Sequence, residues 1–372
     1  MRRVVFLTGT RADFGKLKSL IEVSLSQSDL EVYIFATGMH MQRRYGSTVD
    51  EIVKCGYPNI YKFINATSEK SMDLTLAKTI EGLSNFCGEI QPDLIVVHGD
   101  RVEALAGAIV GSLNNILVAH IEGGELSGTI DELIRHSVSK LSHSHFVANV
   151  NAKKRLMQMG EQESSIYVIG SPDVDVMLST NLPTIEFVKE YYDIHFENFG
   201  LVLFHPVTTE IEQMKHYANQ FAECLAKSGK NYVVVYPNND LGSTYILDSY
   251  NQLKNNDRFL LYPSIRFEYF LVLLKNASFI IGNSSAGIRE APYYGVPTIN
   301  IGTRQQNRST HHDILNVAYD QNVILEAIQK TEKMTLTKEN LYGEGNSNEK
   351  FIQILNSESF WQTNKQKQFK DI

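Results

Sequence analysis

Residues 93–131, DLIVVHGDRVEALAGAIVGSLNNILVAHIEGGELSGTID, decide the fold of this chain. Two apolar runs, 94–97 and 116–119, each end abruptly in polar residues, and small and apolar residues between them fit a helix. This pattern is typical of a strand–helix–strand unit whose parallel strands are buried on both faces. Open parallel sheets bind their ligands beyond the carboxyl ends of the strands. Asp100, Glu122 and Asp131 lie in or just beyond those ends, which predicts acid–base chemistry on a bound molecule.

Length and composition predict a soluble globular protein of two domains, because the 372 residues are 43% hydrophobic and 21% charged. No stretch approaches the ~20 apolar residues that span a bilayer, and the apolar run at the N-terminus is too short for a signal peptide. The three cysteines have no metal or disulfide spacing, which favours the reducing cytoplasm. The net charge of −7 argues against nucleic acid. We therefore expect no nucleic-acid partner, no membrane partner and no bound cofactor.

The whole chain alternates strands with helices, which predicts doubly wound parallel sheets, class α/β. In the first half, strands are expected at 3–8, 31–36, 59–63, 94–98, 116–121, 144–148 and 166–170, and helices at 14–27, 72–89, 101–113, 131–141 and 150–159. Ser171-Pro172-Asp173 then resembles a hinge. In the second half, strands are expected at 200–204, 231–236, 258–261, 277–281 and 297–301, and helices at 209–228, 266–275, 285–293 and 320–331. A loop is expected at 334–348 and a helical tail at 349–371. Two sheet domains joined by a hinge would form a cleft, the default ligand site.

Two loops have the composition of anion sites. GTRADFGK, 9–16, follows the first strand and opens a helix, so its backbone N–H groups, with Arg11 and Lys16, would suit a phosphate. NSSAGIREA, 283–291, is a similar turn in the second half, where Ser284 and Ser285 would open a helix and offer N–H groups to an anion. Glu290 could accept hydrogen bonds from ribose hydroxyls. The alternatives are an ordinary turn with surface charges in the first case and a serine N-cap before a surface glutamate in the second.

The carboxylates and histidines also have plain structural readings. Asp100 could simply pair with Arg101, yet three acids at successive strand ends favour catalysis, because neighbours can push apart the pKa values of paired carboxylates. His205 ends the first strand of the second half, where it could donate to a phosphate or be structural. Five further histidines of the first half show no HExxH or HxxEH spacing, so no catalytic metal is expected: His98, His120, His136, His143 and His145.

Taken together, seven motifs in chain order resemble the hydrolysing UDP-N-acetylglucosamine 2-epimerases, in particular the bacterial enzymes of sialic-acid capsule synthesis. The motifs are GTRADFGK (9–16), HGDR (98–101), HIEGGELSGTID (120–131), HPVTTE (205–210), PNND (237–240), GNSSAGIRE (282–290) and GTRQ (302–305). The resemblance covers roughly residues 1–310. It departs from the non-hydrolysing epimerases, which typically begin GTRPE and carry an HRREN-type stretch where HPVTTE stands here.

The resemblance implies two Rossmann-like domains of the glycosyltransferase-B type, with the C-terminal helix returning to the first domain. Their bounds would be 1–172 with about 355–372, and 173–354. The implied reaction converts UDP-GlcNAc and water to ManNAc and UDP. Asp100, Glu122 and Asp131 would carry the chemistry, with Arg101 beside them, and Arg266 is expected near the sugar. The UDP would be held by Arg11, Lys16, His205, Asn238, Ser284, Ser285, Glu290 and Arg304.

Three other functions stay open at this point. A related hydrolysing epimerase acting on UDP-2,4-diacetamido-2,4,6-trideoxy-glucose, for legionaminic acid, would use the same machinery. A glycosyltransferase of the same fold would need an acceptor. A non-catalytic nucleotide-sugar sensor would have little use for several carboxylates beside a diphosphate, because they repel the ligand. The sequence is compatible with a homo-oligomer, a dimer or a tetramer, and an apolar helix at 101–113 could serve its interface or the core.

Overall fold

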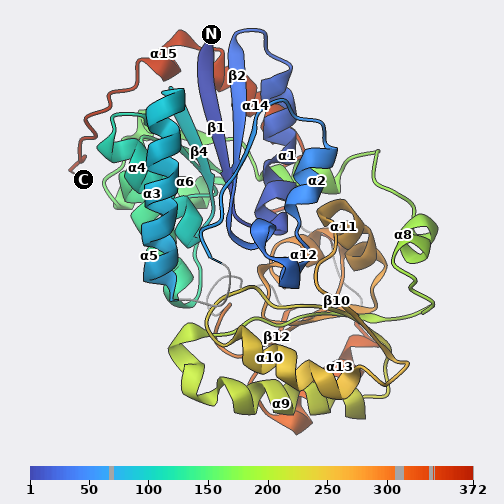
Figure 1. Cartoon of the computed structure of the whole chain (residues 1–372). Helices are drawn as coiled ribbons and strands as arrows, with labels where there is room; N and C mark the ends of the chain where they lie inside the picture. The colour runs from blue at the N-terminus through green and yellow to red at the C-terminus, as the bar shows by residue number, and fades with distance from the viewer. Residues whose placement is uncertain (67–70, 306–313, 335–337, 339, 372) are drawn as a thin grey trace. The chain divides into compact units, whose positions relative to one another are not determined.

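The computed structural model describes residues 1–66, 71–305, 314–334, 338 and 340–371 (Figure 1). Contacts between Cα atoms divide the chain into two compact units. Unit 1 comprises Met1–Glu125, Asp131–Ser179 and Leu341–Ile372, and unit 2 comprises Leu126–Ile130 and Thr180–Asn340. Each unit is built on its own sheet.

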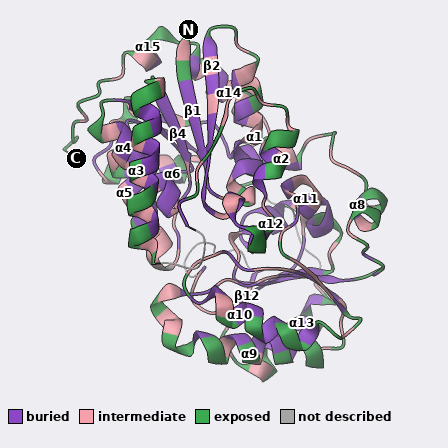
Figure 2. Cartoon of the chain, viewed as in Figure 1, coloured by how far each residue is buried: buried purple, intermediate pink, exposed green. Residues whose placement is uncertain are grey.

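The sheet of unit 1 has seven strands in the order β3-β2-β1-β4-β5-β6-β7. Every paired neighbour runs parallel, and Val4 of β1 lies between Val32 of β2 and Leu94 of β4. The central strands β4 and β5 are buried along almost their whole length, as strands covered on both faces must be (Figure 2). The strands of this sheet are β1 Arg2–Thr8, β2 Leu30–Ala36, β3 Ile60–Lys62, β4 Leu94–His98, β5 Leu117–Ile121, β6 Ser144–Val147 and β7 Ile166–Val168.

Helices join these strands and cover the sheet. They are α1 Arg11–Leu25, α2 Val49–Lys54, α3 Met72–Ile90, α4 Val102–Leu113, α5 Thr129–Leu141, α6 Val150–Gln158 and α7 Pro172–Met177. The residues expected to form a hinge instead begin α7, because proline suits the first position of a helix, where no N–H is needed. The predicted hinge at 171–173 is therefore wrong.

The end of the chain returns to unit 1 as α14, Ser347–Leu355, followed by the short α15, Glu358–Trp361. Phe351 of α14 is fully buried. Its ring centroid lies 6.4 Å from that of Phe6 and 4.9 Å from that of Phe146. Asp175 of α7 accepts hydrogen bonds from the N–H groups of Ser347 (2.9 Å) and Asn348 (3.0 Å), which caps the start of α14. The returning helix thus begins earlier than expected, and 173–179 and 341–354 pack with unit 1 rather than with the second half.

The sheet of unit 2 has six parallel strands in the order β10-β9-β8-β11-β12-β13. The strands are β8 Gly200–Leu203, β9 Tyr232–Val235, β10 Phe259–Tyr262, β11 Phe279–Gly282, β12 Thr298–Ile301 and β13 Ile314–Val317. The helices are α8 Ile185–Tyr191, α9 Ile211–Lys227, α10 Ser243–Tyr250, α11 Phe267–Asn276, α12 Glu290–Tyr294 and α13 Gln321–Thr331. Two doubly wound parallel sheets confirm the predicted fold class.

The predictions of individual elements failed where tertiary packing outweighs local pattern. The helix predicted at 285–293 is a 3-10 turn, Ser285–Gly287, followed by the short α12. Pro292 has no N–H to donate, so a helix that begins at 285 cannot run through it. β13 and α10 were not predicted, since each offers only a brief apolar run. The expected loop at 334–348 lies partly outside the described residues, and α14 begins inside it.

Candidate functional site

Asp100 and Glu122 follow the neighbouring strands β4 and β5 of unit 1, and one arginine joins them. Arg135 of α5 forms an ion pair with the Asp100 carboxylate through Nη2, and its Nη1 donates to the backbone carbonyl of Glu122 at 2.6 Å. The side chain of Arg135 is only 3% exposed, whereas that of Asp100 is 23% exposed. Because a guanidinium donates in a rigid planar fork, this contact fixes the two loops relative to each other.

Glu122 itself is buried in a strained backbone conformation, with a φ of +63° that few residues other than glycine adopt. Its Oε1 accepts a hydrogen bond from Ser171 Oγ at 2.5 Å, and His98 Nε2 lies 3.3 Å from Oε2. Backbone strain of this kind persists only where the surroundings hold it, and it concentrates at functional sites. The carboxylate of Glu122 thus accepts a hydrogen bond on one oxygen and has an imidazole near the other.

Asp131 lies in the first turn of α5, four residues before Arg135, so the two side chains project from the same face of the helix. The hydroxyl of Ser139, on the following turn, lies 3.0 Å from Nδ1 of the buried His120, and Nε2 of that ring is 2.8 Å from the carbonyl of Gly99. Helix α5 is therefore connected to the loop of Asp100 at two places along its length. Asp100 and Glu122 thus follow the carboxyl ends of β4 and β5, and Asp131 lies in the first turn of the helix that comes next in the chain.

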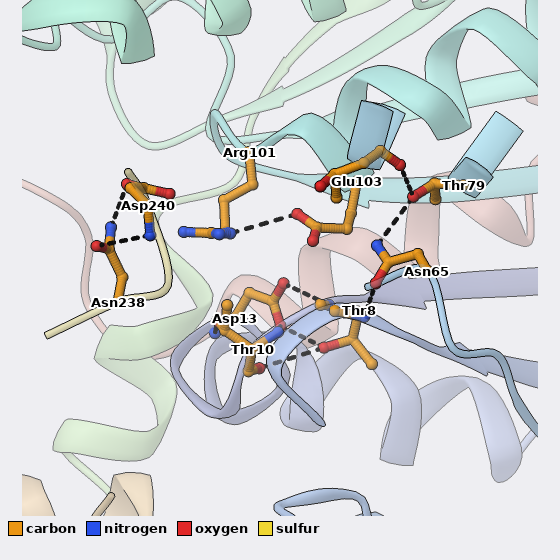
Figure 3. Close-up of polar contacts among 12 residues, drawn as sticks. Thr8, Thr10, Asp13, Asn65, Thr79, Arg101, Glu103, Asn238 and Asp240 are labelled. Atoms are coloured by element: carbon orange, nitrogen blue, oxygen red, sulfur yellow. Dashed lines mark hydrogen bonds and ion pairs between the residues drawn. The ribbon is translucent and has the colours of Figure 1, made fainter. Parts of the chain in front are cut away.

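The first glycine loop is closed by a reciprocal hydrogen-bonded cap. Asp13 accepts hydrogen bonds from the N–H groups of Gly9 (3.0 Å) and Thr10 (3.2 Å), and the Thr10 hydroxyl caps Asp13 N in return (Figure 3). This reciprocal capping box engages the backbone N–H groups of Gly9, Thr10 and Asp13 within the loop itself. Burial raises the pKa of Asp13, although the hydrogen bonds from Thr8 and Gly9 oppose that rise.

The cations of the same segment also have carboxylate partners within unit 1. Arg11 forms an ion pair with Glu51 of α2. Lys16 Nζ lies 3.1 Å from Asp173, and the side chains of Lys16 and Asp173 are at most 9% exposed. Arg101 Nε lies 3.3 Å from the buried carboxylate of Glu103 (Figure 3). Asp100 therefore pairs with Arg135 of α5, whereas the adjacent Arg101 contacts a different acid, Glu103.

The buried histidines of unit 1 make structural hydrogen bonds. His40 lies 3.0 Å from Thr8 Oγ1 and 2.7 Å from Thr48 Oγ1, and burial lowers its pKa to about 3. His145 contacts Glu161 at 3.0 Å, and the ring of His143 accepts a hydrogen bond from Val118 N. Among the residues that the structure describes, no three His, Cys, Asp or Glu side chains are placed to share a metal ion.

In unit 2, His205 follows β8 and is locked by its neighbours. Its ring Nδ1 accepts from Asn238 N at 3.0 Å, so the neutral ring carries its proton on Nε2. Its backbone N–H donates to Asn283 Oδ1 at 2.7 Å, and Asn283 Nδ2 donates to the His205 carbonyl at 2.9 Å. Asn238 in turn donates to Asp240 at 2.5 Å (Figure 3). The sequence motif places His205 correctly at a strand end, but only the structure shows what orients its ring.

The Ser284-Ser285 turn and Arg304 meet around the same asparagine. Arg304 Nη1 and Gln305 Nε2 both donate to the carbonyl of Asn283, at 3.2 Å and 3.0 Å. The Ser284 hydroxyl accepts from Ala286 N at 3.3 Å, so Ser284 is an N-cap as its plain reading predicted. The structure thus brings the carboxyl ends of β8, β11 and β12 together through Asn283.

Glycine is required at the end of β11. Gly282 has a φ of +140°, and a Cβ there would lie 1.9 Å from the carbonyl oxygen of Leu203 on β8. Glu290, at the start of α12, is buried. Because α12 has only five residues, its dipole adds little to an anion site, contrary to the sequence-based expectation of a long helix. A diphosphate here would depend on the polar side chains and on the N–H groups of the turn.

Comparison with known proteins then decides the family. The family described as UDP-N-acetylglucosamine 2-epimerase matches residues 24–356. The chain belongs to the UDP-N-acetylglucosamine 2-epimerase family.

Two relatives support this membership, and one solved structure shares the fold. It is 49% identical to the UDP-N-acetylglucosamine 2-epimerase of Neisseria meningitidis serogroup B, over the whole of both chains. It is 31% identical to the UDP-N,N'-diacetylbacillosamine 2-epimerase (hydrolyzing) of Legionella pneumophila, over 95% of this chain and 96% of the relative. The Methanocaldococcus jannaschii UDP-GlcNAc 2-epimerase, solved in complex with UDP-GlcNAc and UDP, shares the fold with a TM-score of 0.82 at 23% identity, covering 95% and 99% of the two chains.

The structure also brings residues of this epimerase into the site that the sequence did not single out. Arg135, Ser171 and Asn283 each hold a predicted site residue, and Glu103 holds Arg101. The one signal in the sequence was the i, i+4 spacing of Asp131 and Arg135 on a helix.

Arg266 of the epimerase lies in an aromatic environment. Its guanidinium carbon lies 5.4 Å from the ring centroid of Tyr191 and 5.4 Å from that of Tyr269, within the range of cation–π attraction. Its backbone N–H donates to the Tyr192 hydroxyl at 3.0 Å.

None of the helices in the described residues is both long and apolar enough to cross a bilayer.

Proposed function

We propose that the protein is a hydrolysing UDP-GlcNAc 2-epimerase, which converts UDP-GlcNAc and water to ManNAc and UDP for sialic-acid synthesis. Membership of the family and full-length similarity to a UDP-N-acetylglucosamine 2-epimerase support the substrate. HPVTTE at 205–210, where non-hydrolysing epimerases carry an HRREN-type stretch, supports hydrolysis, as does a relative named as hydrolyzing. The geometry that supports the chemistry most is Arg135, which ties Asp100 to the loop of Glu122.

The chemistry of the substrate favours elimination over direct epimerisation. The hydrogen at C2 of the sugar is not next to a carbonyl, so its removal alone would leave a carbanion that nothing stabilises. If a base takes this proton while the C1–O bond breaks, the electron pair forms a C1–C2 double bond and UDP leaves with the bonding electrons. The resulting glycal is then protonated at C2 from the opposite face while water adds at C1. This route needs an acid, a base and a cationic cradle for the diphosphate.

The two units divide these tasks in our proposal. Asp100, Glu122 and Asp131 of unit 1 carry out the proton transfers and orient water. The diphosphate is held by unit 2 through His205, the Ser284-Ser285 turn and Arg304. The remaining proposed ligands of the substrate are Arg11, Lys16, Arg101, Asn238, Arg266 and Glu290. Such an enzyme needs no bound cofactor.

The compartment is proposed from the cysteines. All three are free thiols, which fits a reducing cytoplasm. A homo-oligomer, a dimer or a tetramer, also stays a proposal.

Reaction in deuterated water tests the proposed route. Purified protein is incubated with UDP-GlcNAc, and the products are analysed by NMR and mass spectrometry. We expect UDP and free ManNAc with one deuterium at C2, because the proton that returns to C2 comes from solvent. Unlabelled ManNAc would refute the elimination route, and UDP-ManNAc as the sole product would mean a non-hydrolysing epimerase.

Conservative variants test the roles of the acids. Asp100→Asn, Glu122→Gln and Asp131→Asn each remove a charge with little change in shape. Each should lower kcat by about 100-fold or more, the usual loss when a general acid or base is removed. Their affinity for UDP, measured by calorimetry, should stay near that of the wild type, because none of the three acids is a proposed ligand of UDP. Near-wild-type turnover in all three would refute the assignment.

The second candidate substrate is UDP-2,4-diacetamido-2,4,6-trideoxy-glucose. The observation in its favour is the 31% identity to the diacetylbacillosamine epimerase over nearly the whole of both chains. The two sugars differ at C4 and C6, so only side chains at the sugar decide between them. Supplying both nucleotide sugars together and measuring the ratio of the two kcat/KM values separates the candidates, and a higher value for the diacetamido sugar would reverse our order.

A further inference from the structure

Glu103 is a buried carboxylate for which the proposed chemistry has no use. It lies in the first turn of α4 and is 3% exposed, and its Oε2 lies 3.3 Å from Arg101 Nε. Burying a carboxylate is costly unless it is paired. Figure 3 shows the side chain of Arg101 approaching Glu103 through Nε, with its terminal nitrogens on the side away from that carboxylate. The pair therefore holds the guanidinium in one orientation.

Two loops of backbone hold Glu103 in place. A Cβ on Gly9, after β1, would lie 2.9 Å from Glu103 Cδ, and one on Gly38, after β2, would lie 2.7 Å from Oε1. Both positions are too close for any side chain, so glycine at 9 and 38 makes the space that the carboxylate fills. Gly38 N is itself held by Asn65 Oδ1 at 3.2 Å (Figure 3). Glu103 thus has little freedom to move.

We propose that Glu103 is a positioning residue for Arg101. Glu103 holds Nε and thereby orients the terminal nitrogens of the guanidinium, which in this proposal meet the negative charge that develops as UDP leaves. An arginine side chain loses much rotamer freedom when it binds, and a carboxylate that orders it beforehand removes that loss from the reaction. The inference rests on the proposed function, since it assigns a role within the same site.

The test is a double-mutant cycle with turnover as its readout. Glu103→Gln keeps the shape and removes the charge, and we expect kcat/KM for UDP-GlcNAc to fall about tenfold, since a charge-assisted hydrogen bond is roughly twice as strong as a neutral one. Arg101→Met should lose more. The double variant should match Arg101→Met within about twofold, because Glu103 has nothing left to orient. Glu89→Gln, an exposed glutamate on α3, is the matched control and should leave kcat/KM unchanged.

The kcat/KM of Arg101→Lys is a second test of the proposal, and it does not require that any Glu103 variant folds. Lysine keeps the positive charge but has no Nε, so we expect a loss close to that of Arg101→Met. Wild-type kcat/KM in Glu103→Gln, full additivity in the double variant, or wild-type kcat/KM in Arg101→Lys would each overturn the inference. A wild-type protein that releases no UDP from UDP-GlcNAc would instead refute the proposed function, so the two failures are distinguishable.

Discussion

Replacement of Arg135 by methionine probes the connection between the two acids most directly. The change removes the partner of the Asp100 carboxylate and the donor to the Glu122 carbonyl while keeping much of the buried side-chain volume. Hydrogen bonds that involve a charged group contribute about 1.5–3 kcal/mol each. If about half of the two contributions is expressed in the transition state, roughly 1.5–3 kcal/mol is lost, and kcat falls on the order of 10- to 100-fold.

The assay measures UDP release at saturating UDP-GlcNAc, with KM, the Kd for UDP and the thermal melting curve recorded for the same preparation. We expect KM and the Kd for UDP to change by no more than about threefold, because Arg135 holds acids rather than the diphosphate. Arg135→Lys is the matched control, and it should recover only part of the rate, since one ammonium lacks the planar fork that reaches both loops.

Chemical rescue sharpens the result. Arg135→Ala leaves a space in which added guanidinium can bind, and low millimolar guanidinium should raise its kcat without affecting the wild type. Two results would refute the reasoning: kcat within twofold of wild type in Arg135→Met, or a loss of UDP affinity as large as the loss of kcat.

Three further predictions concern stability. Burial lowers the pKa of His40 to about 3, against about 6.5 in the unfolded chain. As pH falls, the unfolded state therefore takes up its proton first, and the free energy of unfolding should fall between about pH 6.5 and pH 3. His40→Gln should remove up to about 1.4 kcal/mol per pH unit of this slope, measured by urea titration. Gly282→Ala should prevent unit 2 from folding, because the added Cβ would lie 1.9 Å from a carbonyl oxygen. Gly88→Ala is the control, since a Cβ at residue 88 has nothing within 4 Å. On denaturant unfolding it should leave the protein intact or stabilise it by up to about 1 kcal/mol. Lys367→Met should cost about 3 kcal/mol in the same measurement, because it leaves the buried Glu161, 2.6 Å from that ammonium, without one of its cations; an unchanged midpoint would contradict this.

Much of the fold could be predicted because buried parallel strands have apolar sequences that end at polar residues. The strands β4 and β5 were located to within a residue, and Asp100 and Glu122 were expected at their carboxyl ends. The site residues of unit 2 followed from the same rule, since His205 and Ser284 come directly after β8 and β11. Their part in catalysis and binding stays a prediction.

Other elements could not be predicted, because their stability comes from contacts distant in the chain. α7 was mistaken for a hinge, although Asp175 within it caps α14, which begins at residue 347. The capping box of Asp13 engages the N–H groups that the glycine loop was expected to offer to a phosphate, and the sequence pattern alone fits both readings.

The sequence by itself determined the alternation of strand and helix, the two parallel sheets and the strand ends at which the polar residues gather. These depend on local periodicity and on the burial of apolar side chains, which neighbours in the chain are enough to specify. Only the tertiary structure decided which charges meet: Asp100 pairs with Arg135, Lys16 with Asp173 and Arg101 with Glu103. An ion pair needs its two groups within about 4 Å, and for residues in different loops or helices that distance is set by how the sheet and its helices pack.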